Sequence, residues 1–239
     1  RRPPRATLVP DTTRVLSTTI DYNAASGVAR TSKEIMASII VLGWPQHKGI
    51  LDKLIGEKIE HIVRNTDKTI FICNLNGSLL ANRKIIVAVP PLAELEDGFL
   101  LWLIKVSLLA QELNASLSFY CNAKTGEAIK HVKAINLSIL YSIENFTDWD
   151  DFLVLARNIG QDDLVILVSA RNGSVSHLNL LDDLPLKLEK YFEKNNRIII
   201  YPQQFNQKYG TESHDEISTE SLSKGIRTIQ KLWKGLGNK

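Results

Sequence analysis

The stretch from Arg83 to Tyr120 constrains the fold more than any other part of the chain. It opens with a short run of apolar, mostly β-branched residues at 85–89, which is typical of a strand buried on both faces. Two prolines end that run, and leucine and isoleucine then recur at helical spacing from 100 to 109. Another apolar run, at 117–120, predicts a second strand. This order predicts a βαβ unit, whose two strands are parallel and whose crossover is right-handed.

Two parallel strands leave too much apolar surface uncovered to fold alone, so the rest of the chain must widen and cover this sheet. Glu94, Glu96 and Asp97 precede the helix of the βαβ unit, and we expect their negative charge to favour its start. Strands and helices alternate throughout, which predicts an α/β fold of mostly parallel sheets with helices on both faces. The other strands are expected at 15–21, 38–43, 68–74, 137–141, 164–169 and 197–201, and the other helices at 24–36, 52–65, 125–133, 148–158 and 181–194.

The predicted elements form two blocks with the same order of parts. Strand, helix, strand, loop, helix and strand follow one another at 15–74 and again at 137–201. Only the second block has a βαβ unit ahead of it, so the first lacks its opening strands. We therefore predict an incomplete first repeat at 1–80, a complete second repeat at 81–206 and a polar, basic tail at 207–239.

The composition excludes several classes of protein. A content of 44% hydrophobic and 23% charged residues is that of a soluble globular protein, and a net charge of +3 does not argue for a nucleic-acid partner. No apolar run approaches the ~20 residues of a membrane-spanning helix. Cys73 and Cys121 have neither disulfide nor metal spacing, so we interpret them as reduced core thiols. The chain begins at Arg1 without a methionine, and we expect it to be a segment of a longer protein.

The order of five strands and four helices, with a glycine-flanked loop after the fourth strand, resembles the universal stress protein fold. Several stretches are similar to the cytoplasmic C-terminal tail of bacterial sodium/proton antiporters, in which tandem stress-protein-like repeats follow a multi-helix membrane transporter. The resemblance spans roughly residues 14–205. It rests on IDYNAASGVARTSKE (20–34), VAVPPLAELEDGF (87–99), DWDDF (148–152), DDLVILVSARNGSVS (162–176) and NNRIIIYPQQF (195–205).

This resemblance implies tandem stress-protein-like repeats that form a regulatory domain of a cation/proton antiporter and not an enzyme. The partners that it implies are the protein's own upstream transmembrane antiporter domain and a second copy in a homodimer. The intact protein would lie in the bacterial inner membrane, with this segment on the cytoplasmic side. In folds of this kind the final strands of two repeats commonly pair, and 69–73 and 197–201 can do so here.

Stress proteins that bind nucleotide hold the phosphates with a loop of the pattern G-x2-G-x9-G-[ST]. Gly43 and Gly56 fit the first and third glycines, and Gly49 lies between them. Gln46 stands where the second glycine is expected, and Glu57 stands at the hydroxyl position. Gln46 restricts the backbone, and Glu57 brings negative charge toward a phosphate. We therefore expect no cofactor at this degenerate loop, although its residues remain candidates for ATP binding.

A second candidate loop follows the strand at 164–169 and contains Arg171, Gly173, Ser174 and Ser176. The carboxyl ends of strands are where α/β sheets usually bind ligands, and an arginine with hydroxyls can bind an anion. The other interpretation is a polar loop whose serines satisfy main-chain groups. The alternative function is a universal stress protein that binds ATP or another adenine nucleotide. It would need an intact glycine loop and a first strand ending in aspartate.

The sequence indicates no catalytic or metal centre. Ser174 and His177 have no G-x-S-x-G motif around them, and the histidines have no metal-ligand spacing, so a hydrolase is not supported. The tail at 218–239 has apolar residues at near-helical spacing with lysine and arginine between them. Such a helix can contact an anionic membrane surface, can dock on its own domain, or can be a frayed end. These three interpretations of the tail stay open.

Overall fold

The computed structural model describes residues 23–44, 59–136, 139–150 and 152–204. The predicted strand at 15–21, Gln46, Gly49, Gly56 and the tail at 207–239 lie outside the described residues. The strands are β1 (Ile39–Gly43), β2 (Thr69–Asn74), β3 (Lys84–Ala88), β4 (Ser116–Cys121), β5 (Tyr141–Asn145), β6 (Leu164–Val168) and β7 (Arg197–Tyr201). The α-helices are α1 (Ala24–Glu34), α3 (Phe99–Glu112), α4 (Ala123–Asn136) and α5 (Leu184–Tyr191), and 59–65 is also helical. The 3-10 helices are η1 (Leu79–Ala81), η2 (Ala93–Leu95), η3 (Phe152–Asn158) and η4 (Asn179–Asp182).

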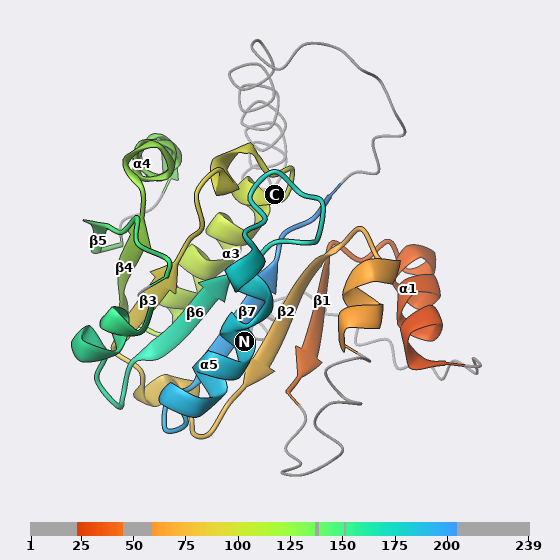
Figure 1. Cartoon of the computed structure of the whole chain (residues 1–239), viewed down its shortest axis with the longest axis horizontal. Coiled ribbons are helices and arrows are strands. Elements are labelled where there is room, and N and C mark those ends of the chain that lie inside the picture. The colour runs from red at the N-terminus through yellow and green to blue at the C-terminus, as the bar shows by residue number, and fades with distance from the viewer. Residues whose placement is uncertain (1–22, 45–58, 137–138, 151, 205–239) are drawn as a thin grey trace, which may run out of the picture.

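The described strands form one seven-stranded sheet in the order β1-β2-β7-β6-β3-β4-β5 (Figure 1). Neighbouring strands are parallel except β2 and β7, which are antiparallel, with Ile70 opposite Tyr201 and Asn74 opposite Arg197. The predicted pairing of 69–73 with 197–201 is thus confirmed. Two parallel blocks, β1-β2 and β7-β6-β3-β4-β5, meet edge to edge in a single sheet, so the predicted α/β fold class is also confirmed.

The predicted βαβ unit consists of β3, α3 and β4. Every residue of β3 after Lys84 is buried, as the β-branched run predicted. β3 and β4 are parallel, with Ile85 opposite Leu117. α3 packs against them through a buried side that includes Trp102 and Val106. This unit forms the centre of the larger block, with β6 and β7 on one side and β5 on the other.

Helices cover both faces of the sheet, as predicted (Figure 1). α3 and α4 share one hydrophobic core with residues of the central strands such as Val87 and Ile166. The helical segment 59–65, η3, η4 and α5 share the other core, with residues such as Val165 and Leu167. Because successive side chains of a strand point to opposite faces, β6 needs apolar residues at every position. Its sequence LVILV is buried throughout.

Two predicted elements differ more than the others from the structure. A strand was expected at 137–141, but α4 continues to Asn136 and β5 begins only at Tyr141. After the helix the chain must cross from the helix layer to the sheet, and Leu140 on this path is 80% exposed. The helix expected at 148–158 is the 3-10 helix η3, in which Phe152 and Leu155 are buried. Their spacing of three residues matches the period of a 3-10 helix.

Asparagine side chains fasten the segment between the two blocks. Asn196 Oδ1 accepts hydrogen bonds from the main-chain N–H groups of Asn76 (2.8 Å) and Gly77 (3.0 Å). Asn196 Nδ2 donates to Asn82 Oδ1 (2.8 Å), and Asn82 Nδ2 donates to the carbonyl oxygen of Asp162 (2.6 Å). The chain between β2 and β3 is therefore tied to the starts of β6 and β7. The division into repeats 1–80 and 81–206 stays a prediction, since the described sheet continues across it.

Candidate functional site at the switch point of the sheet

The sheet has a topological switch point at the carboxyl ends of β3 and β6. β3 continues through α3 to β4 on one side of it, whereas β6 continues through α5 to β7 on the other. The two connections leave in opposite directions, and the crevice between them is where open α/β sheets bind ligands. The segments that follow the two strands here are 89–98 and 169–177, and the second contains the candidate loop.

Glu96 joins these two segments. Its Oε1 accepts hydrogen bonds from the main-chain N–H (3.0 Å) and the hydroxyl (2.6 Å) of Ser176. Its Oε2 accepts a hydrogen bond from Gln204 Nε2 (3.3 Å). Glu96 is 7% exposed and Ser176 is 1% exposed, so the contact lies inside the protein. A buried carboxylate is tolerated only where donors replace the water that it has lost, and these three donors do so.

Two of the acidic residues before α3 make contacts that the sequence did not predict. The helix begins at Phe99 and has no acidic residue in its first turn. Glu94 Oε2 instead accepts a hydrogen bond from the hydroxyl of Thr125 in α4 (2.7 Å). Glu94 and Glu96 thus form hydrogen bonds with segments distant in sequence, and the effect of the acidic residues on the helix start stays a prediction.

Arg171 ties three segments together through its guanidinium group. Nε donates to the carbonyl oxygen of Val63 (3.2 Å), Nη1 donates to that of Pro202, and Nη2 donates to that of Lys68. The residue is 8% exposed. Burial lowers the pKa of Arg171 to about 10, and the nearby carboxylates of Glu96 and Asp67 oppose this shift. The side chain therefore stays protonated at neutral pH and holds the first block, the loop after β6 and the segment after β7 in one place.

The segment after β7 crosses this crevice. Gln203 N–H donates to the hydroxyl of Thr69 (3.0 Å), and Gln204 N–H donates to the carbonyl oxygen of Asp67 (3.0 Å). Gly98 packs directly against Gln203 of this segment. A Cβ at position 98 would collide with the main-chain nitrogen of Gln203. Protein atoms of residues 202–204 thus occupy the mouth of the crevice.

The structure brings together four of the predicted site residues and separates them from Gly43. Arg171, Gly173, Ser174 and Ser176 share the loop after β6, and Gly173 has a φ of 84°. Gly43 ends β1, opposite Cys73 of β2. Since β2 and β7 are antiparallel, the carboxyl end of β1 lies at the opposite end of the sheet from the carboxyl ends of β3 and β6. Gly43 is therefore distant from the loop after β6, and the other residues of the first candidate loop lie outside the described residues.

Sequence reasoning missed Glu96 and Gln204 as members of this site. Glu96 and Ser176 are separated by 80 residues, and no local pattern connects them. The one available signal was a carboxylate placed just after the strand that flanks the switch point. From the sequence, Glu96 is interpreted as a residue that favours the start of the following helix and not as a residue of the crevice.

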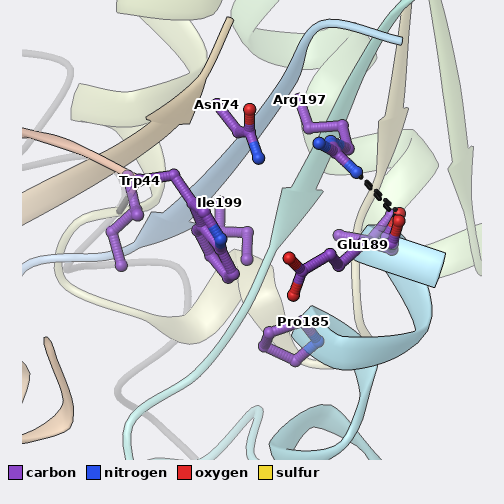
Figure 2. A pocket seen from close by; sticks show the side chains of 8 residues that line it. Trp44, Asn74, Pro185, Glu189, Arg197 and Ile199 are labelled. Atoms are coloured by element: carbon purple, nitrogen blue, oxygen red, sulfur yellow. Dashed lines mark hydrogen bonds between the residues drawn. The ribbon is translucent and has the colours of Figure 1, made fainter. Parts of the chain in front are cut away.

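A separate pocket lies at the other end of the sheet, between the first block and α5 (Figure 2). About 220 Å³ of empty space, open solvent included, lies between its lining residues. Arg197 and Asn74 lie at one end of it and Pro185 at the other (Figure 2). The lining residues are Trp44, Ile72, Asn74, Pro185, Leu188, Glu189, Arg197 and Ile199.

Arg197 is the buried cation of this pocket. Its Nη1 donates to the carbonyl oxygens of Leu188 (3.3 Å) and Glu189 (3.1 Å). Its Nε is buried and has no hydrogen-bond partner among the described residues. Burial lowers the pKa of Arg197, and the carboxylates of Glu189 and Glu193 oppose this shift. The space beside Arg197 is narrow and lined mostly by apolar atoms, so this pocket does not resemble the switch-point site.

The described residues offer no nucleophile paired with a base. His177 Nε2 lies 3.2 Å from Asp182 Oδ1, and Ser174 Oγ has no hydrogen-bond partner in this part of the chain. Cys73 and Cys121 are free thiols, as expected, and burial raises the pKa of Cys121 to about 12. Within the described ranges, no group of three or more His, Cys, Asp or Glu side chains is placed to hold a metal ion. None of the described helices is long and apolar enough to cross a membrane.

Comparison with solved structures finds several similar chains, and two of them are described below. No protein-family model matches the chain, and neither does any curated protein. A universal stress protein from Archaeoglobus fulgidus DSM 4304 aligns with 77% of this chain and 66% of its own, at 12% identity and a TM-score of 0.45. The chain therefore spans slightly less than two thirds of that protein. The cytoplasmic domain of a prokaryotic cation chloride cotransporter aligns with 75% of this chain and 70% of its own, at 14% identity and a TM-score of 0.46. TM-scores below 0.5 at such identities do not establish a shared function.

Proposed function

We propose that residues 14–205 form the cytoplasmic regulatory domain of a sodium/proton antiporter and have no catalytic activity. The observation that carries this proposal is that two of the motifs similar to antiporter tails form one contact. VAVPPLAELEDGF (87–99) contains Glu96, and DDLVILVSARNGSVS (162–176) contains Ser176, to which Glu96 is hydrogen-bonded. Two separate stretches of the resemblance thus meet at the switch-point crevice.

The closed crevice supports a regulatory domain over the alternative, a stress protein that binds ATP. Glu96 and the segment 202–204 lie in the crevice at the carboxyl ends of β3 and β6, where open α/β sheets usually bind ligands. Arg171 is buried and donates to three carbonyl oxygens, so its guanidinium group is directed at the main chain of the protein itself. ATP is accordingly not proposed as a cofactor. Regulation by such a domain requires a ligand or contact whose affinity differs between two states of the transporter.

The partners proposed are the upstream transmembrane domain and a second copy of this chain. β1 is the terminal strand of the described sheet, and apolar side chains are exposed on and beside it. Val41 on β1 is 68% exposed, and Ile35 and Met36 after α1 are 61% and 85% exposed. Contact with another chain would cover these side chains, and linkage to a dimeric transporter would raise their effective concentration. Nucleic acid is not proposed as a partner.

The intact protein is proposed to lie in the bacterial inner membrane, with this domain on the cytoplasmic side. The basic tail at 207–239 is proposed to contact the anionic membrane surface, where each lysine or arginine contributes about 1 kcal/mol. This contact would hold the domain close to the transporter.

Ion exchange by the full-length protein tests the regulatory role. Everted membrane vesicles that contain the full-length protein should show sodium-dependent proton movement. Deletion of residues 14–205 should leave that exchange in place but shift its dependence on sodium concentration or pH. Identical profiles for the intact and shortened proteins, measured at equal protein amounts, would show that the domain does not regulate transport.

A further inference from the structure

The dipeptide Asn-Gly occurs twice in the chain, and each time a serine follows it. The two tripeptides are 76–78, between β2 and β3, and 172–174, in the loop after β6. Asparagine is a thermolabile residue, and it is least stable before glycine, which has no Cβ to keep its nitrogen away from the asparagine side chain. Because the two tripeptides are identical, the lifetimes of their asparagines depend mainly on the structure around them.

The reaction that removes such an asparagine is an intramolecular displacement. The main-chain nitrogen of the glycine loses its proton and attacks Cγ of the asparagine. A bond between this nitrogen and Cγ replaces the Cγ–Nδ2 bond, and ammonia leaves. Water then adds to one of the carbonyl carbons of the cyclic imide and opens it, which yields aspartate or isoaspartate. The glycine nitrogen and the asparagine side chain must both be free to move for the ring to close.

Hydrogen bonds hold the reacting groups at Asn76. Its Nδ2 donates to the carbonyl oxygens of Glu193 and Asn195. The attacking nitrogen would be that of Gly77, and it donates to Asn196 Oδ1 (3.0 Å), which also accepts from the main-chain N–H of Asn76 (2.8 Å). Asn76 and Gly77 are exposed to solvent, but ring closure would have to break these bonds first.

The same groups at Asn172 lack such contacts. Asn172 and Gly173 are exposed, and neither the Asn172 side chain nor the Gly173 N–H has a hydrogen-bond partner among the described residues. A main-chain hydrogen bond spans this turn, from the N–H of Ser174 to the carbonyl oxygen of Arg171 (3.0 Å). A Cβ at either Gly173 or Gly77 would meet no atom within 4 Å, so space for the ring does not distinguish the two sites. The hydrogen bonds do.

We propose that Asn172 is a site of spontaneous deamidation in the folded protein, and that the hydrogen bonds around Asn76 protect the same tripeptide there. Either product adds a negative charge to the loop after β6, and isoaspartate also lengthens the main chain of its turn. This loop holds Glu96 through Ser176, so the modification falls on a segment that closes the switch-point crevice. The proposed modification does not depend on the antiporter assignment.

Peptide mapping by mass spectrometry tests the proposal on the full chain, incubated in mildly alkaline buffer below its Tm and sampled over time. In the folded protein, Asn172 should deamidate at least about tenfold faster than Asn76, since two neutral hydrogen bonds are together worth about that factor. In urea the two sites should react at similar rates. Equal rates in the folded protein, whether fast or slow, would overturn the proposal. A difference that persists unchanged in urea would assign it to the neighbouring sequence and would also refute the proposal.

Two substitutions test whether Asn196 supplies the protection. Asn196→Ala removes the acceptor of the Gly77 N–H, and deamidation of Asn76 should then become faster. Asn82→Ala is the matched control, because it also breaks the contact between Asn82 and Asn196 but leaves Asn196 Oδ1 in place. It should leave the rate at Asn76 near that of wild type. An unchanged rate at Asn76 in an Asn196→Ala protein that is folded by circular dichroism would overturn the assigned protection. If Asn196→Ala does not fold, the comparison of the two sites in the wild-type protein decides the proposal.

Discussion

Replacing Arg171 by methionine should destabilise the protein more than any surface substitution. Methionine has a similar length but leaves the carbonyl oxygens of Val63, Lys68 and Pro202 without donors. Hydrogen bonds to a charged group contribute about 1.5–3 kcal/mol each, so three sum to about 4–9 kcal/mol. The desolvation of a buried guanidinium costs several kcal/mol and offsets part of this sum. We expect a net loss of about 3–5 kcal/mol in the free energy of unfolding, which is a large fraction of the stability of an ordinary domain.

Urea unfolding followed by circular dichroism measures this loss. Arg157→Met is the matched control, because Arg157 is an exposed arginine in η3 and its replacement should change stability by less than about 0.5 kcal/mol. Arg171→Lys should recover only part of the loss, since an ammonium group cannot reach three separated carbonyl oxygens in the plane of a guanidinium. If Arg171→Met unfolds within about 0.5 kcal/mol of the Arg157→Met control, Arg171 does not hold the two blocks together as described.

Three further outcomes are expected. Gly98→Ala should lower the free energy of unfolding by about 1–3 kcal/mol in a urea titration, because its Cβ would collide with the segment after β7. The control is Gly77→Ala, which has open space around the new Cβ and should leave the free energy of unfolding nearly unchanged. At pH 8 a thiol reagent should modify Cys73 before Cys121, because burial raises the pKa of Cys121 to about 12 and keeps it a neutral thiol. Faster labelling of Cys121 in the folded protein would contradict its burial. Calorimetry should detect no tight ATP binding by the wild-type chain, and a dissociation constant in the low micromolar range would disprove that expectation.

The parts of the fold that depend on local pattern could be predicted from the sequence. The β-branched run that became β3, the helical spacing of α3 and the buried run of β6 each determine an element through their own residues. β5 could not be placed correctly because α4 is longer than its pattern indicates and the edge strand YSIEN is only partly buried. The antiparallel contact of β2 with β7 was expected from family resemblance, since no local signal in the two strands indicates their partner.

The candidate site was predicted only in part, for a related reason. Arg171, Ser174 and Ser176 were found because a strand end in an α/β sheet marks a candidate site regardless of the rest of the chain. Two of its features depend on segments far apart in sequence. Arg171 donates to main-chain oxygens, and Glu96 accepts hydrogen bonds from Ser176. Carbonyl partners in particular carry no side-chain signature, so the sequence cannot indicate them.

The most direct test of the central claim is the cellular location of the native gene product. An antibody against residues 14–205, applied to fractionated cells, should detect the protein in the inner-membrane fraction after washing with alkaline carbonate. Protease should reach the domain in everted vesicles but not in right-side-out ones, since the domain is proposed to lie on the cytoplasmic side. Recovery of the native product wholly in the soluble fraction would contradict the antiporter assignment.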